Sequence, residues 1–216
     1  MKNKKVIEAT IKFVKEQLKD EPTGHDWFHI DRVVKLSEKI AKEEGGDLYT
    51  ITLIALLHDI SDYKLNTNEK EGVAKLENFL NTTIDEESLK QQIKTDIEGI
   101  SFKGANVRGS LLSKEGQIVQ DADRLDAIGA IGIARAFAYG GNKKRSMYNP
   151  DQKPEEHRSF EDYKSSKGHT INHFYEKLLL LKDRLNTSTA KNIAQERHTF
   201  MENFLNQFYN EWDVKS

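Results

Sequence analysis

Apolar residues recur mostly three or four positions apart along this chain, which is the period of an amphipathic helix. Only three prolines interrupt the sequence. The pattern therefore predicts an all-α fold. The expected helices cover residues 2–19, 26–44, 48–61, 68–80, 85–99, 113–139, 155–185 and 189–211, and residues 140–154 form a long polar loop.

The stretch 48–61 is apolar on most sides, which predicts a central helix with other helices packed around it. Asp47 precedes this stretch and is expected to cap its start. Its last turn carries His58 and Asp59. A buried helix gains nothing in packing by ending on an imidazole beside a carboxylate, because an unpaired buried charge costs several kcal/mol. A divalent cation bound there would remove this cost.

Other histidine and aspartate side chains that could join this site lie elsewhere in the chain. His29 lies upstream, and the segment 121–126 downstream is rich in aspartate. Imidazole nitrogens and carboxylate oxygens together suit divalent ions such as Mn, Fe, Co, Ni or Zn. Two histidines and two aspartates would leave coordination positions open for water and a substrate oxygen. Because cysteine is absent, any metal must be bound by His, Asp or Glu.

The same side chains also have ordinary structural roles. An imidazole and a carboxylate can complement a helix end, and His29 can bond to a backbone carbonyl. Asp121 and Asp126 can be helix caps or ion-pair partners. The small side chains of residues 113–139 would let this helix approach its neighbours closely. Asp123 can join His58 and Asp59 only if the two helices cross at that point.

The composition limits the class of partner. Lys and Arg number 33 against 35 Asp and Glu, a formal net charge of −2, so no global basic field is available to hold a polyanion. Nucleic acid is therefore not expected as a partner. The chain begins without an apolar signal core, and no segment approaches the roughly 20 apolar residues that span a bilayer. We expect a cytoplasmic protein with no membrane partner, consistent with its lack of cysteine.

The ordered set of His29, His58-Asp59 and Asp123 resembles the His…His-Asp…Asp signature of the HD-domain metal-dependent phosphohydrolase superfamily. The sequences around these residues extend the likeness, because segments 24–33, 55–60 and 120–141 are similar to those of bacterial single-domain HD hydrolases that act on nucleotides. An ordered set in matching local sequence is far more specific than a His-Asp pair alone.

The resemblance implies one α-helical HD domain over residues 1–216, with a metal-site core at about 22–140 and C-terminal helices at about 155–211. It also implies that one divalent ion is bound by His29, His58, Asp59 and Asp123, and that phosphate esters or anhydrides are hydrolysed. Manganese is the first expectation for the ion, with Mg, Co, Ni, Fe or Zn as alternatives.

The same resemblance implies a small nucleotide substrate, and specifically cleavage of nucleoside triphosphates to monophosphate and pyrophosphate. Asp62 occupies the place of the acid that handles the proton in many members. His25, one turn before His29, is expected either to contact substrate phosphate or to cap the helix. Lys103 offers a cation that would meet a phosphate or remain an ordinary loop lysine.

Two other functions remain open from sequence. One is a nucleotide phosphomonoesterase or cyclic-nucleotide phosphodiesterase on the same scaffold, and the other is a non-catalytic HD module that senses a nucleotide. The intact ligand set and Asp62 argue against the sensor. The sequence leaves the oligomeric state undetermined.

Overall fold

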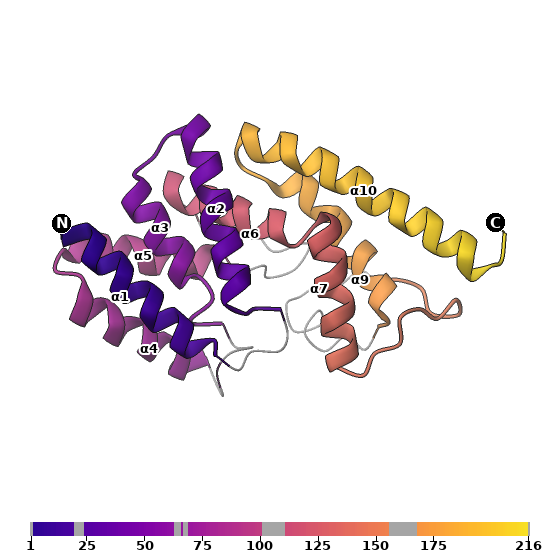
Figure 1. The fold of residues 1–216 in the computed structure, drawn as a ribbon, viewed down its shortest axis with the longest axis horizontal. Coiled ribbons are helices and arrows are strands. Elements are labelled where there is room, and N and C mark those ends of the chain that lie inside the picture. The colour runs from indigo at the N-terminus through magenta and orange to yellow at the C-terminus, as the bar shows by residue number, and fades with distance from the viewer. Residues whose placement is uncertain are drawn as a thin grey trace. The chain divides into compact units, whose positions relative to one another are not determined.

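The computed structural model describes residues 2–19, 24–62, 66, 69–100, 111–155 and 168–215. Every regular element within them is a helix, which confirms the predicted all-α fold (Figure 1). The elements are α1 (Lys2–Gln17), α2 (Trp27–Glu44), α3 (Leu48–Leu57), α4 (Glu69–Thr83), α5 (Glu87–Ile100), α6 (Lys114–Asp126), α7 (Gly129–Asn142), α9 (Thr170–Glu176), the 3-10 helix η1 (Leu178–Arg184) and α10 (Ser188–Trp212).

The chain forms two compact units, with Ala122 as the last residue of the first and Asp123 continuing the chain in the second. None of the helices in the described part of the chain is both long enough and apolar enough to cross a membrane. The bounds of α1, α2, α4, α5 and α10 lie within three residues of the predicted ones at each end. The extent of one HD domain over residues 1–216 stays a prediction.

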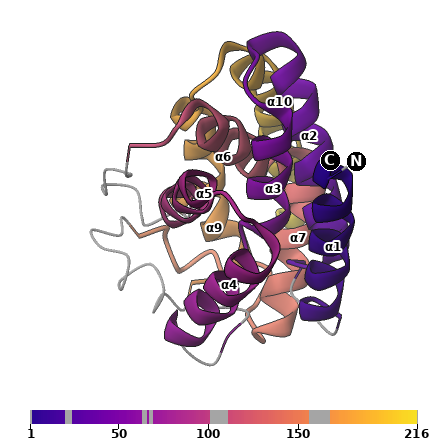
Figure 2. The same ribbon diagram turned by 90° about the vertical axis from the view of Figure 1, so that its left-hand side faces the viewer.

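Helix α3 forms the centre of the first unit, as its apolar sequence predicted. It packs against α1, α2 and α5 (Figures 1 and 2), and its residues from Leu53 to Leu57 are all buried. Asp47 caps its start, because the carboxylate accepts the Thr50 N–H at 2.8 Å. These contacts bury α3 almost completely and hold its last residues against α2.

The predicted end of this helix at residue 61 is wrong, because α3 ends at Leu57 and His58 is its C-cap. The chain then tightens into turns in which the Ile60 N–H bonds to the Leu57 carbonyl at 3.0 Å and the Asp62 N–H bonds to the Asp59 carbonyl at 2.9 Å. These i to i+3 bonds replace the α-helical ladder. His58 and Asp59 therefore lie at the helix terminus rather than within its last turn.

The prediction of one helix over residues 113–139 is also wrong. Helix α6 ends at Asp126, Ile128 is extended, and α7 begins at Gly129 with φ +76°. The break is stabilised from far along the chain, since the Arg197 side chain of α10 donates to the Leu125 carbonyl at the end of α6. A local sequence pattern cannot reveal a contact with a residue about 70 positions away. The small residues therefore predicted one unbroken helix.

The helix predicted over residues 155–185 is interrupted. Residues 156–167 lie outside the described part of the chain. His169 is not helical and caps α9, because its Nδ1 accepts the Asn172 N–H at 3.1 Å. The chain leaves the α conformation again at Lys177 and continues as η1. In the second unit α10 packs against α7 and η1.

Candidate metal centre

The start of α2 determines where His29 lies. Asp26 is the N-cap of this helix, and its Oδ1 accepts the His29 N–H at 2.9 Å. Capping by aspartate satisfies a backbone donor that the helix itself leaves without an acceptor. The His29 side chain is fully buried in the first turn, one position before the buried Ile30. Asp26 thus holds the helix terminus that carries the histidine.

The end of α3 orients His58 through its own backbone. The His58 Nδ1 lies 2.8 Å from the Ala55 carbonyl oxygen. A carbonyl can only accept, so Nδ1 carries the hydrogen and the lone pair of the neutral ring is on Nε2. This is the tautomer in which Nε2 can ligate a metal. The same Nε2 lies 3.5 Å from Asp59 Oδ1.

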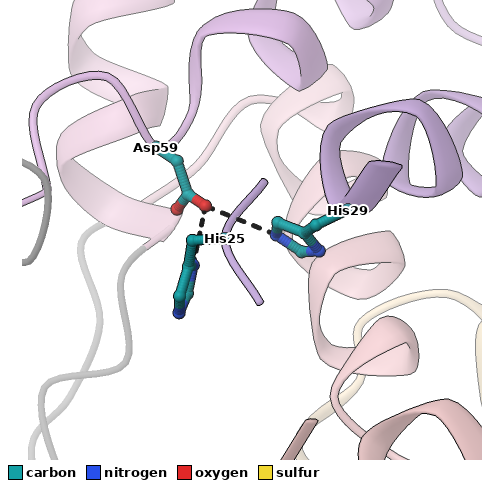
Figure 3. A group of neighbouring side chains, drawn as sticks. All are labelled: His25, His29 and Asp59. Carbon is teal, nitrogen blue, oxygen red and sulfur yellow. Dashed lines mark hydrogen bonds and ion pairs between the residues drawn. The ribbon is translucent and has the colours of Figure 1, made fainter. Parts of the chain in front are cut away.

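Asp59 lies between the histidines of the two helices. Its Oδ2 accepts a hydrogen bond from His25 Nδ1 at 2.9 Å and lies 3.4 Å from His29 Nε2 (Figure 3). His25, His29 and Asp59 each offer one ligand atom, and these three atoms lie within 4.8 Å of one another. With His58 on the other carboxylate oxygen, three imidazoles surround one carboxylate. Both oxygens of Asp59 are therefore next to a nitrogen.

The electrostatics of this cluster favour the ionised carboxylate. Burial alone would raise the pKa of Asp59, but the charges of His58 and His25 and hydrogen bonds from His25 and His29 hold it well below its ordinary value. Asp59 is thus an anion at neutral pH. An anionic oxygen among imidazole nitrogens is a donor set that divalent cations accept.

The structure brings the predicted metal ligands His29, His58 and Asp59 together and adds His25 to them. His25 had been predicted as a substrate contact or a cap, and its Nδ1 is engaged with Asp59. The fourth predicted ligand, Asp123, lies on α6 directly after Ala122, the last residue of the first unit. Its ligation stays a prediction.

The turn after the His-Asp pair carries Asp62, the predicted proton-handling residue. The Asn66 carboxamide donates to both the Ile60 and the Asp62 carbonyl oxygens, each at 2.9 Å. Lys75 on α4 donates to Asn66 Oδ1 at 3.1 Å. Asn66 therefore supports the Asp62 backbone. Sequence reasoning missed it, because a single asparagine in a polar segment belongs to no motif.

The predicted substrate contact Lys103 lies outside the described residues.

Comparison with known proteins identifies the family. Residues 27–128 match the HD domain family. The chain is 39% identical to protein YpgQ of Bacillus subtilis over 212 residues, which cover 96% of this chain and 94% of YpgQ. The chain belongs to the HD-domain family. Members of the HD superfamily are metal-dependent phosphohydrolases, so this protein is an enzyme of the hydrolase class.

Solved structures of similar proteins agree with this chain over nearly its whole length. A protein of Lactobacillus plantarum is 38% identical, with a TM-score of 0.90, and covers 97% of this chain and 98% of its own. An HD-superfamily hydrolase of Bacillus thuringiensis is 45% identical, with a TM-score of 0.74 and 99% of each chain covered. YpgQ has been solved in complex with ADP; that structure is 36% identical, with a TM-score of 0.78, and covers 98% of this chain and 97% of its own.

Proposed function

We propose that this HD hydrolase acts on small nucleotides and that its reaction is the cleavage of nucleoside triphosphates to monophosphate and pyrophosphate. The observation that carries the proposal is the Asp59 carboxylate held between His25, His29 and His58 in an HD-family chain. The complex of the relative YpgQ with ADP supports a nucleotide as the substrate class. We place the reaction in the cytoplasm, in keeping with the cysteine-free composition.

The proposed ligands of one divalent ion are His29, His58, Asp59 and Asp123. The first three are supported by their mutual geometry. Asp123 is supported by its place in the HD signature and on α6, whose earlier residues Ile118, Val119 and Ala122 are buried. Manganese is the ion we propose, because two imidazoles and two carboxylates form an intermediate donor set. When bound, such an ion acidifies water and offsets charge on a phosphoryl group.

In this proposal, one residue accepts the proton of the attacking water and others contact the phosphates. In the proposed step the oxygen of a water forms a bond to the α-phosphorus, and the bond from that phosphorus to the bridging oxygen breaks. Pyrophosphate leaves with the electron pair, and the proton of the water passes to the Asp62 carboxylate. His25 has its Nδ1 on Asp59, so a phosphate contact would use its Nε2 face. Lys103 remains the proposed second phosphate contact.

Product analysis tests this reaction. Purified protein is incubated with each nucleoside triphosphate and deoxynucleoside triphosphate in Mn²⁺ and in ¹⁸O-labelled water. We expect pyrophosphate, with the label in the monophosphate. Label found only in orthophosphate would overturn this proposal and indicate a phosphomonoesterase. Nucleotide binding with no turnover in any divalent ion would replace it by a nucleotide sensor, which the ADP complex of YpgQ would equally suit.

A further inference from the structure

The first turn of α6 is bonded to a buried carboxylate on α5. Asp96 is only 1% exposed. Its Oδ1 accepts the Ser113 backbone N–H at 2.9 Å, and its Oδ2 accepts the Ser113 hydroxyl at 2.6 Å. The Ser113 Oγ in turn accepts the Gly116 N–H at 3.0 Å, which is the bond of a helix N-cap. Asp96 thus bonds to the residue that caps α6.

Gly116 allows this contact. A Cβ added at Gly116 would lie 2.3 Å from Asp96 Oδ1 and 2.5 Å from Asp96 Cγ. Real Cβ atoms do not approach other atoms so closely, so the backbone of α6 can lie against the carboxylate only because residue 116 has no side chain. The negative charge of Asp96 also lies at the positive end of the α6 dipole.

Two other bonds fix α6 against neighbouring helices. The Gln120 Nε2 donates to the Gly99 carbonyl at 3.0 Å, near the end of α5. The Asp47 N–H at the start of α3 donates to Glu115 Oε1 at 3.1 Å. Helix α6 is therefore held at two levels along α5 and also at the start of α3, the helix that leads to the His-Asp pair.

We propose that Asp96 is a positioning residue for the metal centre: with Ser113 and Gly116 it sets the axial position of α6 and hence that of Asp123. The inference rests on the proposed function, in which Asp123 is the fourth ligand. Asp123 lies ten positions after Ser113 on this helix, about 15 Å along its axis. A slide of one residue would move it by about 1.5 Å and turn it by about 100°, whereas ligation tolerates about 0.2 Å.

The test is the Mn²⁺ dissociation constant of purified protein, measured by titration calorimetry at a temperature where circular dichroism shows each variant folded. We expect Asp96→Asn and Gly116→Ala each to weaken binding by about 10–100-fold, the range for residues that orient metal ligands. Ser113→Thr keeps the capping hydroxyl and should bind like wild type. A purely structural role for Asp96 would lower the melting temperature and leave the dissociation constant unchanged.

Two controls match the type of substitution. Gly141→Ala is also a glycine replacement in a helix, and a Cβ there meets nothing within 4 Å. Thr187→Ala also removes an N-cap hydroxyl, here from α10. Both controls should keep wild-type Mn²⁺ affinity.

The outcomes separate this inference from the proposed function. Failure of the wild type to bind any divalent ion would overturn the proposed function. Wild-type affinity in both Asp96→Asn and Gly116→Ala, with Asp123→Asn impaired, would overturn only the positioning role. If Asp96→Asn does not fold, Ser113→Ala, which removes a single hydroxyl, decides in its place by the same measurement.

Discussion

The Nδ1 of His58 donates to the carbonyl oxygen of Ala55 at 2.8 Å, three residues earlier on the same helix. The last turn of α3 therefore selects the tautomer of its own terminal histidine and turns the Nε2 lone pair toward Asp59. A ligating histidine usually needs a partner from elsewhere in the fold to do this. Here the Ala55 carbonyl, one of the last four of the helix, fills that role.

Wild-type protein is expected to take up one divalent ion per chain, and a His58→Ala, Asp59→Ala double variant is expected to lose it. The variant removes the His58 imidazole and the Asp59 carboxylate, which accepts a hydrogen bond from His25, and thus two of the proposed ligands. Elemental analysis after dialysis, together with Mn²⁺ titration, measures both. Stoichiometric metal in the double variant would exclude this pair as ligands.

Asp62→Asn should keep the metal and lose turnover by about 10²–10⁴-fold, the usual contribution of a general acid–base group. The amide has the size of the carboxylate but cannot take the proton of the attacking water. Steady-state kinetics over a range of pH, with Mn²⁺ titration of the same sample, separates catalysis from binding. A near wild-type rate at every pH would show that another group handles the proton.

Asn66→Ala should lower kcat about tenfold or more while Mn²⁺ affinity stays unchanged, because a small misplacement of a reacting group is costly. The variant removes the carboxamide that donates to the Ile60 and Asp62 carbonyls. Asn81→Ala, which lies exposed on α4, is the matched control. Equal kcat in the two variants would mean that the turn holds Asp62 without Asn66.

Asp59 should stabilise the fold at neutral pH and lose this effect only in strong acid. Its pKa in the folded protein lies well below the value of about 3.9 in an unfolded chain, so the contribution is complete above that value. It is lost as the pH falls from about 4 through the lower, folded pKa.

Urea unfolding of metal-free wild type and Asp59→Asn at several pH values measures the Asp59 contribution. The difference in unfolding free energy between the two proteins should not shrink between pH 7 and 5, and it should shrink below pH 4. A difference that already shrinks between pH 6 and 5 would contradict the depressed pKa of this carboxyl group.

Gly129→Ala should destabilise the protein by about 1–2 kcal/mol, the cost of a left-handed conformation for a residue with a side chain. Gly129 has φ +76°, and an added Cβ would lie 3.0 Å from the Arg197 side chain. Gly141→Ala should be neutral or stabilise by up to about 1 kcal/mol, since helical glycine is less favourable than alanine. Chemical unfolding compares the two, and equal effects would show that the break between α6 and α7 tolerates a side chain.

Much of the site could be predicted from the sequence because its determinants are local. The apolar surface of α3 and the Asp47 cap predicted a central helix, and His58 and Asp59 at its end are close because they are adjacent in the chain. The period of three to four also predicted most of the helices. The substrate and the role of Asp123 stay predictions.

Tertiary structure decided what depends on residues distant in sequence. His25 is bonded to Asp59 across 34 positions, and the break after α6 is stabilised by Arg197 across 72. A helical period encodes which face of a segment is buried, but not which side chain of another segment will meet it. Hydrogen bonds between such partners form only once the helices have packed, so the contact of Asp96 with Ser113 could be found only in the folded chain.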